Sequence, residues 1–411
     1  MPLDALCLSG VIHELSGALA GGRIDKIYQP GRDEVVLGLR SPQTGNVKLL
    51  LSASQSHPRA QLTALNRENP DAPPMFCMLL RKHLTGGRLL AISQPPMERI
   101  VDLRFEATNE LGDRVERRLV LEAISRRANL LLLDGEGRIL DCIRRVDSGL
   151  GSAGVQGRIL QPGMFYRLPP AVEKADPAAL SHEELEGLFS AAPEGSRGSS
   201  WLLDTFGGLS PLICRELCFR AWGDDGLTFG EVGESSRSAL LDRLEQLLTT
   251  VKQSAFIPTM LTREERPFDF SFIPIGQYHD SVKSIPFSAF SPLLDQFYEQ
   301  KEQQERVKQR GQDLIRAVTN ARDRTARKIA HQEQELAATQ NREQLRQFGD
   351  ILTSNLHCME RGMNCLHTVD FYDPEQREVD IRLDPLLTPQ QNSAKYYKEY
   401  NKAKTAEKML T

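Results

Sequence analysis

The chain has 411 residues, which exceeds the roughly 250 to 300 residues at which single cores stop growing, so we expect two or more domains. Lysine and arginine number 51 against 55 acidic residues, and the net charge of -4 excludes a surface that is basic throughout. No run of about 18 apolar residues indicates a membrane span, acidic residues interrupt the first apolar run, and the seven cysteines lack zinc-type spacing. We therefore expect a cytoplasmic protein with no membrane partner, no metal and no cofactor.

Residues 1–172 combine two predicted helices with short alternating apolar runs. Residues 11–19 have a helical apolar face that ends at a glycine pair, and PPMFCMLLRKHLTGG starts behind two prolines and ends at two glycines. Eight segments predict strands: residues 23–30, 33–40, 47–54, 88–94, 99–108, 116–124, 128–134 and 137–145. This pattern predicts an α+β domain with a curved antiparallel sheet.

Residues 173–255, behind a proline-rich linker, are predicted to form a helical domain. In WLLDTFGGLSPLICRELCFRAW an apolar helix breaks at residues 206–210, and a second helix begins at Pro211. This outline is typical of a helix-hairpin-helix, in which the turn at Gly207 and Gly208 would offer backbone N–H groups to a phosphate oxygen. An ordinary αα-hairpin needs the same glycines, so both interpretations stay open.

Residues 256–290 are predicted to be a connector, and residues 291–411 a coiled-coil middle domain. The apolar positions of a long helix over residues 291–340 include one jump of eight, which predicts a coiled coil with a stutter. Residues 306–328 contain eight basic residues and only two acidic ones. This excess of positive charge favours contact with a phosphate backbone over a merely solvated face. The basic face consists of Arg316, Arg322, Arg324, Arg327 and Lys328.

A shorter helix over residues 343–361 leads into two alternating segments, HTVDFYD and REVDIRLD, which predict a β-hairpin. Thr388 and Pro389 then open a last helix. It runs to Thr411 without a capping residue, so we expect it to be the truncated return arm of a long antiparallel coiled coil.

Several segments, in this order, resemble the NFACT family: LDALCLSGVIHEL, PPMFCMLLRKHLTGG, FGGLSP and LTPQQNSAKYYKEYNK. The resemblance covers essentially the whole chain. It implies an N-terminal domain similar in fold to that of the formamidopyrimidine-DNA glycosylases, then a helix-hairpin-helix domain and a coiled coil. It also implies that the chain stops before the family's C-terminal NFACT-R domain.

The resemblance further implies a ribosome quality-control factor that is not an enzyme. Such proteins bind a large ribosomal subunit that still carries peptidyl-tRNA and recruit aminoacyl-tRNA, which in bacteria is tRNA-Ala. The ribosome itself then extends the nascent chain without a template. The factor needs only surfaces that hold RNA by its shape and phosphates, and the basic helix face would contact ribosomal RNA.

The tRNA-handling positions of the family fall on Asp4, Glu98, Arg99 and Arg126. The family usually has aspartate where this chain has Glu98, and EAISRRANL departs from the family's pattern around Arg126. By residue type alone, Glu98 and Arg99 could be a surface ion pair worth at most about 1 kcal/mol.

Arg81 and Lys82 end the second predicted helix and are possible phosphate contacts. Cations at a helix C-terminus also complement the helix dipole without further purpose.

Two other classes of function stay open. Pro2 would become the N-terminal residue after removal of Met1, and glycosylases use such an amine as a nucleophile with a glutamate beside it. Here the neighbour is Leu3, which argues against a DNA glycosylase. The older name of the family suggests a fibronectin-binding adhesin, against which the missing export signal argues.

Overall fold

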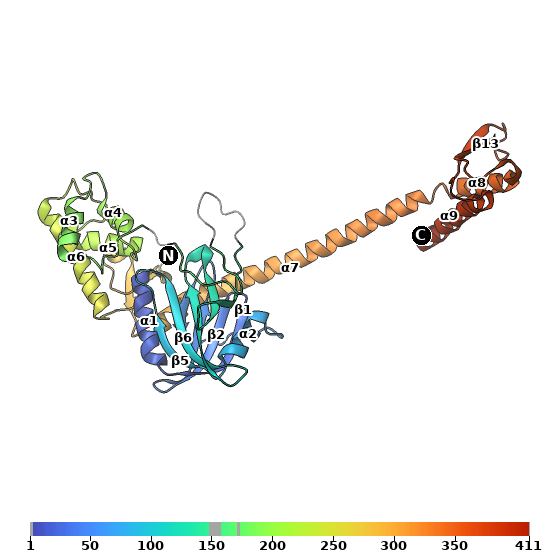
Figure 1. Cartoon of the computed structure of the whole chain (residues 1–411). Coiled ribbons are helices and arrows are strands. Elements are labelled where there is room, and N and C mark those ends of the chain that lie inside the picture. Colours follow the sequence, from blue (N-terminus) through green and yellow to red (C-terminus); the bar gives the residue numbers. More distant parts are fainter. Residues whose placement is uncertain (1–2, 148–157, 171–172, 411) are drawn as a thin grey trace. The chain divides into compact units, whose positions relative to one another are not determined.

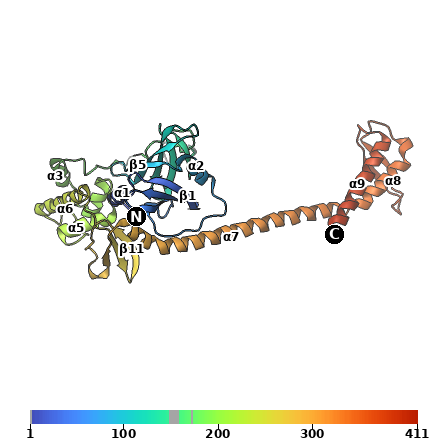
Figure 2. The same ribbon diagram turned by 90° about the horizontal axis from the view of Figure 1, so that it is seen from below.

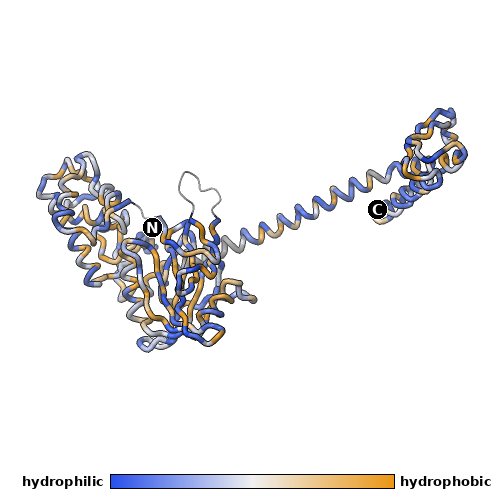
Figure 3. Tube along the Cα trace, viewed as in Figure 1, coloured by the Kyte–Doolittle hydropathy of each residue, from blue (hydrophilic) through white to orange (hydrophobic). Residues whose placement is uncertain are grey.

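The computed structural model of the protein describes residues 3–147, 158–170 and 173–410. They form two compact units, Met1–Gln303 and Gln304–Thr411, and helix α7 runs from the first into the second. None of the described helices is long and apolar enough to cross a membrane. Figure 3 shows apolar residues concentrated in the strands and in α1, whereas α7 is mostly hydrophilic.

A nine-stranded antiparallel sheet forms the frame of the first unit, in the order β4-β3-β2-β1-β5-β6-β7-β8-β9 (Figure 1). All eight predicted strands are confirmed. The sheet also contains β4, which was missed because its four residues, RAQL, look like a loop although Arg59 and Gln61 are buried. The strands are β1 (Arg23–Gly31), β2 (Glu34–Ser41), β3 (Gly45–Ser52), β4 (Arg59–Leu62), β5 (Arg88–Ser93), β6 (Ile100–Thr108), β7 (Arg114–Glu122), β8 (Asn129–Asp134) and β9 (Ile139–Cys142).

Helices α1 (Ala5–Leu19) and α2 (Met75–Leu84) pack on this sheet. Helix α1 starts earlier than residue 11 because Asp4 accepts a hydrogen bond from the Cys7 N–H at 2.7 Å and caps it. Its apolar side chains enter the same hydrophobic core as those of the sheet.

Four further helices belong to this unit: α3 (His182–Ser190), α4 (Gly198–Thr205), α5 (Pro211–Trp222) and α6 (Glu234–Lys252). The predicted break between α4 and α5 is confirmed, because α5 begins at Pro211 behind a Ser210 cap. The structure shows an αα-hairpin here, and its classification as a helix-hairpin-helix stays a prediction.

The predicted connector over residues 256–290 forms a second, three-stranded antiparallel sheet. Its prolines suggested irregular chain, yet Met260, Phe270 and Phe272 are buried in the main core. Figure 2 shows this sheet beside the helices of the first unit. One core therefore extends through the segments predicted as three domains. The strands are β10 (Thr259–Arg263), β11 (Arg266–Ser271) and β12 (Lys283–Pro286).

Helix α7 (Phe290–Ala338) starts inside the first unit, where polar contacts fix its first turns. The Asp295 carboxylate accepts hydrogen bonds from Gln61 Nε2 at 2.6 Å, the Thr63 hydroxyl at 2.8 Å and the Ala64 N–H at 2.9 Å. The start of the long helix is therefore joined to the free edge of β4.

The second unit contains α8 (Arg342–Ser354), the predicted hairpin of β13 (Cys365–Val369) and β14 (Glu378–Arg382), and α9 (Pro389–Leu410). Helix α9 packs on α8, where the Ser393 hydroxyl donates to the Gly349 carbonyl at 3.2 Å. On α7, Leu314 and Val318, two of the apolar residues on which the predicted coiled coil depends, are 67% and 62% exposed. Among the described residues no helix covers them, so the coiled coil stays a prediction.

Candidate functional site

Asp4 and the consecutive residues Glu98 and Arg99 lie on two separate segments of the sequence that come together in the fold. Asp4 precedes α1 and is only 6% exposed. Its carboxyl group receives a hydrogen bond from the Ser210 side chain, and Arg99 acts on it electrostatically. Arg99 also interacts electrostatically with Glu98. Three of the four predicted tRNA-handling residues thus form one group with the cap of α5.

Burial controls the protonation of this group. Burial raises the pKa of Asp4 to about 6, while hydrogen bonds from Ser210 and Cys7 and the charge of Arg99 oppose the rise. Burial also raises the pKa of Glu98, against the effect of Arg99. Burial lowers the pKa of the Arg99 guanidinium, which the charges of Asp4 and Glu98 oppose. Arg99 is thus a half-buried cation on which the charges of two carboxyl groups, those of Asp4 and Glu98, act.

The loop before β6 is fixed by one side chain. Gln94 Nε2 donates to the Ala5 carbonyl at 2.9 Å and to the Glu98 carbonyl at 2.7 Å. The Glu98 N–H donates to the Pro95 carbonyl at 3.1 Å. Met97 has a φ of 53°, in the left-handed region that residues other than glycine rarely adopt. Such a conformation persists only where surrounding contacts impose it.

The turn between α4 and α5 lies against this loop. Gly208 has a φ of 79°, and a Cβ atom added to it would lie 2.5 Å from Met97 Sδ. Its carbonyl accepts from the Ala5 N–H at 3.2 Å, and the Gly207 N–H donates to the Ala175 carbonyl at 2.9 Å. The observed partners of the turn therefore belong to its own chain, and the contact of Gly207 and Gly208 with phosphate stays a prediction.

Arg126 lies in a short 3-10 turn, η1 (Ser125–Arg127), and is exposed. The Arg99 carbonyl, just before β6, accepts from the N–H of Ala123, just after β7, at 2.8 Å. Arg126 follows three residues after Ala123. Arg126 and Arg99 therefore lie at the same end of the β6–β7 hairpin. The nearby Asn129 is structural, because its amide donates to the Arg144 carbonyl at 2.7 Å.

Comparison with known proteins identifies the family to which the chain belongs. A family model described as NFACT N-terminal and middle domains matches residues 4–411. The chain belongs to the NFACT family. The match confirms the resemblance seen in the sequence and covers the whole Asp4, Glu98 and Arg99 group.

Curated NFACT relatives align over nearly the full chain. "Rqc2 homolog RqcH" of Bacillus subtilis is 35% identical over 407 residues, which are 99% of this chain and 68% of that protein. The protein of the same name from Streptococcus pneumoniae is 33% identical over 414 residues, with 100% and 68% covered. Human "Ribosome quality control complex subunit NEMF" is 23% identical, with 88% of this chain and 33% of that protein covered.

Two solved structures are similar to about three quarters of the chain. The fibrinogen-binding protein from Staphylococcus aureus has a TM-score of 0.60 and 28% identity, and covers 72% of this chain and 99% of that one. The N-terminal part of the fibronectin/fibrinogen-binding protein from Streptococcus suis gives a TM-score of 0.59 with the same identity and coverage. The predicted likeness to the glycosylase fold stays a prediction.

The remaining predicted contacts lie outside this group. Arg81 Nε donates to the Ile27 carbonyl at 2.9 Å, and Lys82 forms an exposed ion pair with Glu110 at 2.8 Å. Both cations thus have partners within the chain, and their contact with RNA phosphate stays a prediction. The predicted basic face of α7 is exposed at Arg316, Arg322, Arg324, Arg327 and Lys328.

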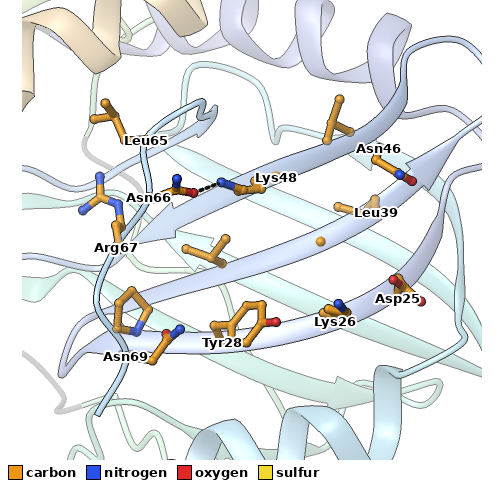
Figure 4. Close-up of a pocket in the computed structure, with 14 residues that line it drawn as sticks. Asp25, Lys26, Tyr28, Leu39, Asn46, Lys48, Leu65, Asn66, Arg67 and Asn69 are labelled. Carbon is orange, nitrogen blue, oxygen red and sulfur yellow. Dashed lines mark hydrogen bonds between the residues drawn. The ribbon is translucent and has the colours of Figure 1, made fainter.

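Sequence reasoning missed a hollow of about 440 Å³ over β1, β2 and β3, beneath residues 65–69 (Figure 4). Tyr28 and Leu65 supply apolar surface, and Lys48 Nζ donates to Asn66 Oδ1 at 2.5 Å across it. Three strands and a loop contribute the lining, so no local pattern in the sequence could have indicated it. Its described lining contains none of the predicted site residues.

The sequence analysis also did not predict a cluster of three possible metal ligands that lies on two paired strands. Cys365, His367 and Asp380 place three donor atoms within 4.8 Å of one another on the β13–β14 hairpin. His367 Nδ1 contacts the Asp380 carboxylate, and both side chains are exposed. A surface ion pair accounts for this arrangement.

Pro2, the residue on which glycosylase chemistry would depend, lies outside the described residues. Leu3, which stands where those enzymes have glutamate, is buried in the core.

Proposed function

We propose that the protein is a ribosome quality-control factor. It binds an obstructed large ribosomal subunit that carries peptidyl-tRNA, and it recruits aminoacyl-tRNA, in this case tRNA-Ala, for template-free extension of the nascent chain. Support comes from relatives named RqcH and NEMF that align with the chain over most of its length. The structural observation that carries the proposal is that Arg99 is half-buried where the loop before β6 packs on the start of α1, with the charges of Asp4 and Glu98 acting on it.

This arrangement suits recognition of RNA. The planar guanidinium of arginine can bond to a phosphate or to a base edge with two parallel hydrogen bonds. A neighbouring carboxylate can hold the guanidinium in place or accept from a base amino group, and Glu98 is that neighbour. Arg126, at the same end of the hairpin, adds a second exposed cation.

The chain acts as a binding factor, and the ribosome supplies the catalysis of peptide-bond formation. The basic face of α7, from Arg316 to Lys328, docks on ribosomal RNA through phosphate contacts that carry little sequence information. In this proposal the protein works in the cytoplasm.

An adhesin is the second candidate, because two solved relatives carry names that describe binding to fibronectin or fibrinogen. One experiment separates the two functions. The protein is isolated from cells under gentle conditions, the bound RNA is sequenced, and the same preparation is tested for binding to immobilised fibronectin. Large-subunit RNA with enriched tRNA supports the proposal, whereas fibronectin binding without enriched RNA supports the adhesin.

A further inference from the structure

We propose that the turn between α4 and α5 is a positioning element for Arg99 and that Asp4 acts through Arg99 without touching tRNA. This inference rests on the proposed function and deepens it. It assigns roles to Gly208, Ser210 and Met97 that no motif in the sequence indicates.

The turn holds the loop before β6 by direct packing. Gly208 leaves room for Met97, because any Cβ at residue 208 would overlap the sulfur atom at 2.5 Å. The backbone of Met97 has a left-handed conformation. Two contacts maintain it: the glycine turn packs against Met97 on one side, and Gln94 forms hydrogen bonds on the other. Glu98 and Arg99 follow directly, so the position of Met97 sets where their side chains begin.

The turn also reaches Arg99 through Asp4. The Gly208 carbonyl accepts from the Ala5 N–H at the first residue of α1, and Ser210 bonds to the Asp4 carboxyl. Asp4 uses its carboxylate to accept from Cys7 as well, and its side chain is almost fully buried. A buried carboxyl with these partners cannot reach a bound RNA, but its charge acts on the nearby guanidinium of Arg99.

These contacts explain why the turn needs glycine at residue 208 and not at residue 207. At Gly207 an added Cβ would meet nothing nearer than 3.6 Å, which is ordinary van der Waals contact. At Gly208 the positive φ and the Met97 sulfur both oppose a side chain. The two neighbouring glycines therefore offer a matched pair of substitutions that both keep the backbone N–H groups.

The test compares Gly208→Ala with Gly207→Ala in the full-length protein, with affinity for purified tRNA and for large subunits as readouts. We expect Gly208→Ala to weaken tRNA binding by about tenfold or more and Gly207→Ala by less than about twofold. Large-subunit binding should stay unchanged in both. Adding Met97→Ala to Gly208→Ala removes the overlapping sulfur and should restore part of the lost affinity. A protein that was merely destabilised would not show this recovery.

Wild-type tRNA affinity in Gly208→Ala, or equal losses in both glycine variants, would overturn the positioning role. Should Gly208→Ala not fold, Ser210→Gly serves instead, since glycine is a tolerated helix cap but lacks the hydroxyl that reaches Asp4. Unchanged tRNA affinity in Ser210→Gly would then overturn the proposal. Arg99→Ala, measured in the same assays, distinguishes a failure of the proposed function from a failure of the positioning role. If it binds tRNA normally, the proposed function fails; if it alone loses tRNA, only the positioning role fails.

Discussion

The carboxylate of Glu14 caps a helix that begins 276 residues later in the chain: it accepts from the Phe290 N–H at 2.5 Å and from the Ser291 N–H at 3.1 Å. A helix N-terminus carries N–H groups without partners in the helix and a partial positive charge, both of which a carboxylate satisfies. Glu14 therefore ties α1 to the start of α7.

We expect Glu14→Ala to lower the free energy of unfolding by about 1 to 2 kcal/mol, the usual cost of losing a helix cap. Urea denaturation of the full chain measures this change. Glu14→Gln keeps an acceptor oxygen without the charge and should lose less. Equal stability of Glu14→Ala and wild type would show that the cap contributes nothing.

Asp4 should give the protein a characteristic pH dependence. Its pKa is raised from 3.8 to about 6 in the folded state, so the folded protein binds more protons than the unfolded chain between these values. Stability contributed by protonated Asp4 is therefore present below about pH 4 and is lost as the pH rises to about 6, by about 3 kcal/mol in total.

Asp4→Asn keeps the helix cap and removes this ionisation. The free energy of unfolding of the variant minus that of wild type should rise between about pH 4 and pH 6 and stay constant above. Urea denaturation at a series of pH values measures this difference. A difference that does not change with pH would mean that Asp4 titrates normally.

Charge reversal tests the basic face of α7. We expect Arg322→Glu, Arg324→Glu and Arg327→Glu together to weaken co-sedimentation with large subunits and to reduce the salt dependence of binding, because fewer counterions are released. A matched control reverses three exposed lysines of α9: Lys398, Lys402 and Lys404. Equal losses in both triple variants would point to net charge instead of a specific face.

Glu98 differs from the aspartate usual in the family by one methylene. Because the carboxylate keeps its place beside Arg99, Glu98→Asp should change tRNA affinity by less than about twofold, whereas Glu98→Lys should weaken it by about tenfold or more through repulsion of Arg99. Filter binding with labelled tRNA measures both. Full affinity in Glu98→Lys would remove this carboxylate from the site.

The sequence predicted those helices and strands whose turns, alternation of apolar residues and caps are visible in a short stretch of chain. The break at Pro211, the hairpin at residues 367–384 and the long helix all carry their own signals of turn, alternation and capping. The strand β4 and the sheet over residues 259–286 do not, since buried Arg59 and Gln61 and several prolines conceal them. Their place is set by tertiary contacts, which override local propensity.

The candidate site was only half predictable for the same reason. Residue types and the family resemblance indicated Asp4, Glu98 and Arg99, but the contact of Asp4 with Ser210 joins segments some 200 residues apart. The LTPQQN segment was also recognised in the sequence, but the contact that its asparagine makes was not predictable from it. Its Asn392 accepts from the Asp384 N–H at 2.8 Å and donates to the Asp384 carbonyl at 3.1 Å, so it closes a loop.

Arg99→Ala tests the central claim most directly. The full-length protein is isolated from cells, and the amounts of co-purified tRNA and large-subunit RNA are measured beside those of Arg104→Ala, an exposed arginine on the same segment of chain. We predict that Arg99→Ala keeps its fold and its large subunits but loses tRNA, while Arg104→Ala keeps both. Wild-type amounts of tRNA on Arg99→Ala would contradict the account.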